Sequence, residues 1–259
     1  MKTKILTTIA SGIFLAATPA MAGTVAISPD EPTLVTTTES GWRVSSSVYG
    51  WFTRLDGEMA FNGTTVPVDV PFDEIFDNLK FSFMGLVEVG KGRWSFMGDF
   101  FYAKLEPSVT NQLGTFDSQI EQFVGNYAVF YRVAETPTGH LDVYGGARVN
   151  WMETDVDIHL NNNTNFSASG EKTWIDPLVG IRFRRDLSEK VFLLGLADIG
   201  GFGVSSDLTW QAMLTLGYRV SDRMSLGLGY RAIGTDYTSG PTTYDVVSHG
   251  LLLGSQFKF

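Results

Sequence analysis

The sequence predicts an all-β fold, a transmembrane antiparallel up-and-down β-barrel of ten strands, with eight and twelve strands as the alternatives. Three observations support it. From Trp42 onward, most segments alternate apolar with polar or small residues and then stop at turn residues. The connections between these segments are short and long in turn, and aromatic residues stand at both ends of the apolar faces. A closed membrane barrel combines these three features.

The chain opens with an export signal. Residues 1–22 begin with Lys2 and Lys4, continue through an apolar stretch, and end at the small-x-small site Ala20-Met21-Ala22. We expect the mature chain to start near Gly23, with residues 23–40 as a periplasmic N-terminal segment and residues 41–259 as the barrel.

Composition narrows the function classes. Without Lys2 and Lys4 the mature chain has 17 Lys and Arg against 28 Asp and Glu, a net charge of −11, which argues against a nucleic-acid partner. There is no cysteine for disulfides or lipid attachment, and no apolar run of about 18 residues follows the signal. Stability must therefore come from burial and backbone pairing.

Ten strands follow from the alternation. They cover residues 41–55, 79–90, 93–106, 117–134, 139–156, 172–185, 190–202, 206–220, 223–236 and 244–259. Short turns lie at 91–92, 135–138, 186–189 and 221–222, and the other connections are 56–78, 107–116, 157–171, a brief 203–205, and 237–243. Outer-membrane barrels place short turns and both termini in the periplasm and longer loops outside.

Residue parity assigns the two faces of each strand. In the last strand Leu251, Leu253 and Phe257 share the face expected to meet lipid, while Gly250 and Gln256 share the other. Outward aromatic pairs such as Trp42 and Phe52 are spaced to reach both edges of an apolar band about 25 Å tall. They predict two aromatic girdles.

The same parity predicts that charged residues of both signs point into the lumen. The predicted lumen-lining residues are Arg43, Glu88, Asp99, Arg132, Asp142, Arg148, Asp176, Arg182, Asp198, Arg219 and Arg231, with Lys80 and Arg184 beside them. A barrel of about ten strands should be nearly filled by its own side chains. The leading interpretation is a plug of ion pairs; the alternative is a narrow pore that favours anions, since arginine is in excess.

The chain resembles proteobacterial outer-membrane β-barrel proteins over nearly its whole mature length. The residues that carry the resemblance are the C-terminal stretch from Gln256 to Phe259, residues 174–182, residues 198–207, and Gly229-Tyr230-Arg231. It resembles an uncharacterised, porin-like family, so it implies a location in the outer membrane of a Gram-negative bacterium and no activity. The resemblance also implies that Phe259 is the signal read by the barrel-assembly machinery.

The first external connection contains a hairpin signal at Asn62-Gly63 and then a short amphipathic helix. Phe72, Ile75, Phe76 and Leu79 follow the spacing of one helical face. The helix is predicted to plug the mouth of the barrel, to lie on its rim, or to contact a partner.

Chemistry-bearing residues are few. Asp155, Asp157 and His159, preceded by Glu153, share one face near the outer end of the fifth strand. They are a weak candidate site for a divalent cation, including one shared with lipopolysaccharide phosphates. The omptin proteases are ten-stranded barrels with carboxylates and histidine at the rim, but the chain shows no motif for their opposing Asp pair, and His249 and Ser248 point to opposite faces.

The sequence therefore predicts a non-enzymatic outer-membrane barrel, structural or a narrow channel, without a cofactor. Its expected partners are outer-membrane lipid, lipopolysaccharide and, during biogenesis, the assembly machinery. A surface enzyme or cation binder around the acidic and histidine cluster is one alternative, and an adhesin or receptor that acts through the external loops is another. Solute, partner and oligomeric state are not encoded in any motif.

Overall fold

A computed structural model describes residues 41–61, 64–110, 114–161 and 165–259. The predicted signal peptide, the N-terminal segment and the turn at Asn62-Gly63 lie outside these residues. One short helix, α2 (Phe72–Asn78), accompanies the strands. The strands are β1 (Trp42–Phe61), β2 (Thr64–Val70), β3 (Leu79–Lys91), β4 (Trp94–Leu105), β5 (Ser108–Thr110), β6 (Gly114–Thr136), β7 (Gly139–Leu160), β8 (Asn165–Asp186), β9 (Val191–Gly201), β10 (Leu208–Arg219), β11 (Met224–Ser239) and β12 (Thr242–Lys258).

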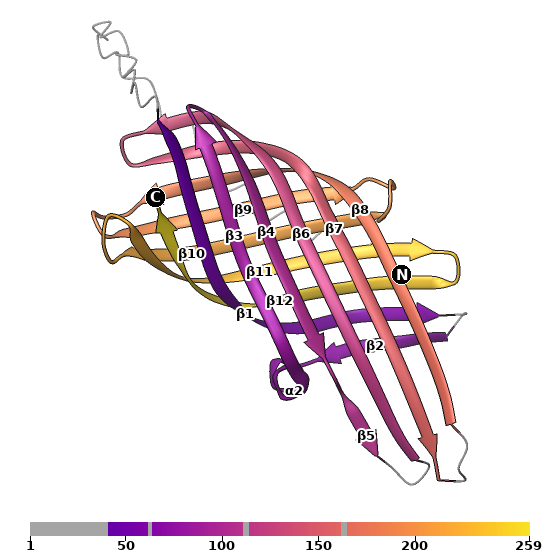
Figure 1. The fold of residues 1–259 in the computed structure, drawn as a ribbon. Helices are drawn as coiled ribbons and strands as arrows, with labels where there is room; N and C mark the ends of the chain where they lie inside the picture. Colours follow the sequence, from indigo (N-terminus) through magenta and orange to yellow (C-terminus); the bar gives the residue numbers. More distant parts are fainter. Residues whose placement is uncertain (1–40, 62–63, 111–113, 162–164) are drawn as a thin grey trace, which may run out of the picture. The chain divides into compact units, whose positions relative to one another are not determined.

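Ten strands close into a ring (Figure 1). Each pairs antiparallel with its neighbours in the chain, and β1 pairs with β12 from Ser45↔Lys258 to Phe61↔Thr242, which closes the sheet. The two further strands are extensions: β2 pairs with the outer part of β1, and β5 pairs with the outer part of β6. The predicted ten-stranded up-and-down barrel is confirmed.

The outer ends of several strands run further than predicted. β7 and β8 stay paired out to His159↔Asn165, where the sequence suggested a loop from 157 to 171. Beyond the apolar band the outer face no longer meets lipid, so the outward positions of β7 become polar, as at Asp157 and His159, and the outward apolar pattern that marks a membrane strand is lost. The backbone nevertheless continues to pair, because pairing satisfies its N–H and C=O groups.

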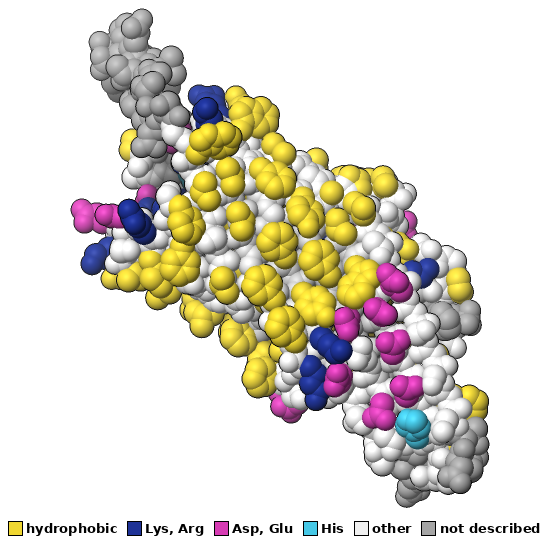
Figure 2. Space-filling model, viewed as in Figure 1, with side chains coloured by type: hydrophobic (Ala, Val, Ile, Leu, Met, Phe, Trp, Pro, Cys, Tyr) yellow, Lys and Arg dark blue, Asp and Glu magenta, His cyan; other side chains and the backbone are white. Residues whose placement is uncertain are grey.

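The outer surface carries the apolar side chains. Phe83, Leu214, Leu253 and Phe257 are 52, 51, 55 and 37% exposed, as expected for side chains that meet hydrocarbon. Figure 2 shows apolar side chains spread across the middle of one face of the barrel wall, with acidic side chains gathered beyond them at one end. The predicted assignment of faces is confirmed for these residues.

The helix α2 does not enter the lumen, so the predicted plug helix is wrong. Phe72 packs edge-on against Phe52 at 5.3 Å between ring centroids, and Phe52 is an outward, lipid-facing residue of β1. Phe76 is 60% exposed. Leu79, assigned to the helix from its spacing, is the first residue of β3. The lumen is not the only place where an apolar helical face can be buried. At the edge of a membrane, hydrocarbon and the outer barrel wall can also cover it.

Among the described residues, no helix is long and apolar enough to cross a membrane.

Candidate functional site in the barrel lumen

Two ion-paired layers cross the lumen. The layer nearer the periplasmic turns centres on Arg182, whose Nη1 and Nη2 each donate to Glu88 at 2.8 Å. Its Nε and Nη2 donate to Asp142 at 3.0 and 2.8 Å, and its guanidinium lies 3.9 Å from the centre of the Phe130 ring. Arg132 adds a third cationic contact to Asp142 at 3.2 Å. Two arginines and two carboxylates therefore form a neutral cluster contributed by β3, β6, β7 and β8.

The second layer is a closed circle of hydrogen bonds. Its six members come from β4, β6, β7, β9, β10 and β11. In order around the circle they are Asp99, Asn126, Arg148, Asp198, Gln211 and Arg231. We call this set the lumen circle. Two arginines and two aspartates alternate in it with neutral amides between them, so it carries no net charge.

Arg148 is one of the two buried cations of the lumen circle. It is fully buried, and its Nε, Nη1 and Nη2 donate to Asn126, Thr209 and Asp198 at 2.8, 2.6 and 2.9 Å. On the other side Arg231 Nη2 donates to Asp99 at 2.7 Å. Burial of an ion is tolerated only with such complete pairing.

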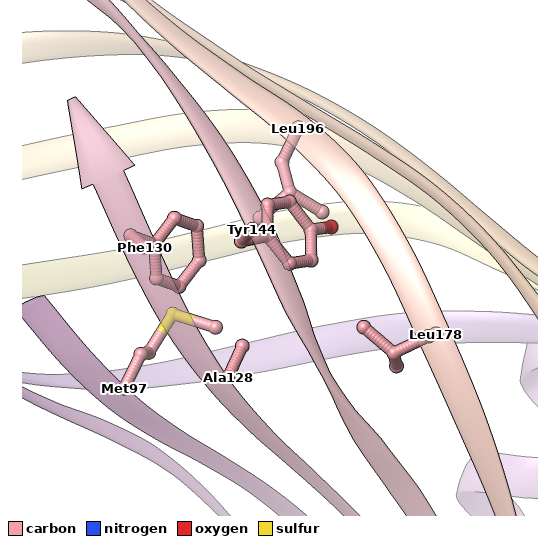
Figure 3. Close-up of a cluster of buried hydrophobic side chains, with 6 residues drawn as sticks. All are labelled: Met97, Ala128, Phe130, Tyr144, Leu178 and Leu196. Carbon is pink, nitrogen blue, oxygen red and sulfur yellow. The ribbon is translucent and has the colours of Figure 1, made fainter. Parts of the chain in front are cut away.

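Apolar side chains fill much of the space between the layers. Figure 3 shows them projecting from β4, β6, β7, β8 and β9 toward one another, and they are Met97, Ala128, Phe130, Tyr144, Leu178 and Leu196. A cavity of about 160 Å³ remains, lined by residues of both ionic layers, including Arg182 and Arg231. The barrel interior is thus a packed core rather than a continuous aqueous space.

Several predicted lumen residues lie elsewhere in the barrel. Arg43 sits exposed at the periplasmic end, where it donates to the Gly92 carbonyl at 2.7 Å. Arg219 is also at that end, paired with Asp186. Asp176 is fully buried, but its two carboxylate oxygens accept from Ser206 N–H and Ser206 Oγ, both at 2.7 Å. Asp176 therefore holds the β9–β10 turn against β8 rather than joining either ionic layer.

The neutral members of the network were missed from the sequence. Tyr49 and Tyr144 donate to Asp99 and Asp198, and Asn126 and Gln211 complete the circle. The inward parity of these residues is visible in the sequence and already places Gln211 on the lumen face, but the set predicted to line the lumen holds charged residues alone. An inward tyrosine or amide in a narrow barrel is itself a signal, since its polar atoms need partners.

The acidic and histidine cluster lies on the outside of the barrel, above the apolar band. Asp155, Asp157 and His159 share the outer face of β7, beyond Trp151. Their partners are on β8: Ser167 donates to Asp157 at 2.6 Å, and His159 Nδ1 lies 3.1 Å from Asn165 Oδ1. Within the part of the chain that the structure describes, no three Asp, Glu or His residues group closely enough to hold a metal ion.

A polar chain crosses the seam where the barrel closes. His249 on β12 contacts Tyr230 on β11 through Nδ1 and Asp56 on β1 through Nε2, the latter at 2.7 Å. Arg54 donates from Nε to both Asp56 oxygens at 2.9 and 3.0 Å. These outward side chains lie just beyond the lipid-facing Phe52 and Leu251, and they link three successive strands. Ser248 takes the opposite face of β12, so no serine nucleophile accompanies His249.

Phe259 ends the chain at the periplasmic end of β12. Its side chain is 81% exposed, and its backbone N–H donates to the Val44 carbonyl at 3.0 Å. The side chain is thus available to another protein, and its role as an assembly signal stays a prediction.

Comparison with known proteins supports the architecture. The outer membrane protease OmpT from Escherichia coli is similar, with a TM-score of 0.53 and 9% identity over 85% of this chain and 98% of OmpT. Neisserial surface protein A matches with a TM-score of 0.37 and 14% identity over 85% of this chain and 98% of its own. The attachment invasion locus protein Ail of Yersinia pestis matches with a TM-score of 0.36 and 12% identity over 85% of this chain and 99% of its own.

No protein-family model matches the chain, and no curated protein sequence does. At these identities the structural likeness shows the fold alone. Together with the exposed apolar band and the closed sheet, it shows that the chain has the fold of an integral outer-membrane β-barrel.

Proposed function

We propose that this outer-membrane barrel is a non-enzymatic, non-conducting protein whose lumen is closed by its own side chains. The observation that carries the proposal is the lumen circle, which joins six strands across the interior through buried, fully paired groups. A permeating ion would have to break these bonds and leave buried charges without partners.

The second ionic layer adds to the barrier. Arg182 and Asp142 are 9 and 2% exposed at their side chains, and Phe130 packs beneath the guanidinium with 1% exposure. A solute that passed the circle would next meet this layer and the apolar cluster around it. The closed interior favours the structural version of the predicted function over the narrow anion pore.

Planar bilayer recording tests the proposal. The purified mature barrel is expected to give no current steps above the leak of the bare membrane, while an established porin in the same chamber gives steps. The double variant Arg148→Ala and Asp198→Ala removes both partners of a central pair without leaving a lone charge, and it is expected to show more frequent openings than the wild type.

Reproducible steps from the wild-type barrel would contradict the proposal. If these steps lost their anion preference in the Arg182→Gln variant, the narrow anion pore would replace it.

A further inference from the structure

The external mouth of the barrel holds a cavity that is separate from the ionic layers. Its volume is about 580 Å³, and it is lined by residues of β1, β2, β7, β8, β11 and β12. We call it the external vestibule and define it by Met59, Met152, Lys172, Trp174, Tyr237 and Tyr244. Every one of these residues lies beyond the apolar band of its strand, so the vestibule faces the cell exterior.

One wall of the external vestibule is aromatic. The ring of Trp174 on β8 stacks on Tyr237 of β11, with centroids 4.6 Å apart and planes 16° from parallel, and Tyr244 of β12 lies 6.1 Å away. β8 pairs with β9 only from Leu178 onward, and β11 pairs with β10 only as far as Asp236. Trp174 and Tyr237 therefore stack where no paired strand stands between β8 and β11. Burial raises the pKa of Tyr244 to about 12, so its hydroxyl stays neutral well into the alkaline range. The wall is therefore flat, apolar and uncharged.

One buried hydrogen-bond donor in this wall, Trp174 Nε1, has no partner among the described residues, and Trp174 is 6% exposed. Buried donors are nearly always satisfied in folded proteins, so an unpaired donor at a cavity points to an acceptor supplied from outside the chain.

Lys172 gives the external vestibule its charge. It lies two residues from Trp174 on the same face of β8, opposite Met152. The neighbouring Glu171 points to the outer face, where its carboxylate accepts from Trp151 Nε1 at 2.8 Å. No carboxylate lines the vestibule among the residues that the structure describes, so Lys172 favours an anionic group there.

We propose that the external vestibule binds small amphipathic carboxylates. The flat apolar body of the ligand lies against the aromatic wall, and its carboxylate pairs with Lys172 and accepts from Trp174 Nε1. A sugar acid fits less well, because beside Lys172 the polar side chains of the lining are threonine and tyrosine hydroxyls, too few to replace the water around several ligand hydroxyls. The site goes beyond the proposed function, since a plugged barrel can still capture a ligand at its outer mouth.

Calorimetric titration of the mature barrel in lipid nanodiscs tests this site, with empty nanodiscs subtracted. The probe is 1-naphthoate, and its comparators are 1-naphthalenemethanol, which has the ring without the charge, and acetate, which has the charge without the ring. We expect saturable binding of 1-naphthoate and at least roughly tenfold weaker binding of each comparator, because 1-naphthalenemethanol lacks the charge-assisted bond and acetate lacks the apolar contact with the aromatic wall.

Variants locate the binding. Lys172→Met, which keeps the length of the side chain, is expected to weaken 1-naphthoate binding roughly tenfold, and Trp174→Phe, which keeps a ring but removes the N–H, to weaken it about threefold. Lys80→Met is the matched control, because Lys80 is an exposed lysine outside the vestibule. It is expected to bind 1-naphthoate like the wild type.

Three results would overturn the inference: no binding of 1-naphthoate at millimolar concentration, equal binding by the wild type and Lys172→Met, or equal weakening by Lys172→Met and Lys80→Met. Circular dichroism and the heat-dependent gel mobility of each variant report whether the barrel is folded. None of these results depends on whether the lumen conducts. The binding proposal and the closed-lumen proposal can therefore be contradicted independently of each other.

Discussion

At the scale of single residues, the barrel interior is governed by paired charges. Arg148 touches three acceptors from three strands, and Asp198 accepts from Arg148, Tyr144 and Gln211. Such a pair adds little stability beyond what well-packed apolar residues would give, since desolvation offsets the attraction. Removing one partner alone is costly, because the other remains buried and charged.

The Arg148→Met variant is therefore expected to lower the free energy of unfolding by about 3–5 kcal/mol, the usual cost of breaking a buried pair. Urea-induced unfolding in lipid vesicles, followed by tryptophan fluorescence, measures it. Arg43→Met is the control, since Arg43 is exposed at the rim, and it is expected to change stability by less than about 0.5 kcal/mol. Equal stability of the two variants would contradict the importance of the lumen circle.

At the scale of elements, glycine allows some neighbouring strands to approach so closely that a side chain would not fit between them. A Cβ placed on Gly250 of β12 would lie 1.8 Å from the Phe52 carbonyl of β1, and one on Gly146 of β7 would lie 2.0 Å from the Tyr127 carbonyl of β6. Both glycines face inward, where a small barrel bends most sharply. The close backbone approach at both positions shows that these glycines permit the sharp curvature of a small barrel.

The Gly250→Ala variant is expected to destabilise the barrel by about 1–3 kcal/mol, because the added methyl group must push apart the two strands that close it. The fraction folded after refolding into vesicles, read from the gel mobility of unheated samples, measures the effect. Gly170→Ala on the outer part of β8 adds the same methyl where nothing lies within 4 Å, and it should refold like the wild type. If the Gly250→Ala barrel were as stable as the Gly170→Ala barrel, the close approach of β1 and β12 would not be needed for stability, and the prediction would be wrong.

At the scale of the whole barrel, the two ends differ in length and charge. The periplasmic turns are short, whereas β6, β7 and β8 project beyond the apolar band and carry the acidic outer face seen in Figure 2. On that face Asp117 pairs directly with Asp157, and Glu121 with Glu153. Directly opposed like charges weaken a sheet. A projecting acidic sheet suits the adhesin or receptor alternative, which stays a prediction.

The orientation can be tested with single cysteines, since the chain has none of its own. In intact cells Ser169→Cys on the outer part of β8 is expected to react with a membrane-impermeant maleimide, while Asp222→Cys in the β10–β11 turn reacts only after the outer membrane is opened. Both positions are exposed, so access to the reagent decides the outcome. The opposite pattern would invert the barrel and place the external vestibule in the periplasm.

The sequence by itself determined the barrel and its lipid-facing residues and favoured ten strands over eight or twelve, because alternation with a period of two indicates which face of a strand each residue takes. The sequence also predicted that most of the buried charged side chains point into the lumen. Only the tertiary structure decided which partner each charge meets, that Asp176 holds a turn, that the α2 helix lies against Phe52 outside the lumen, and that Trp174, Tyr237 and Lys172 share a cavity. Parity is a local property of one strand, whereas contacts across a lumen depend on the register and curvature of all ten strands together.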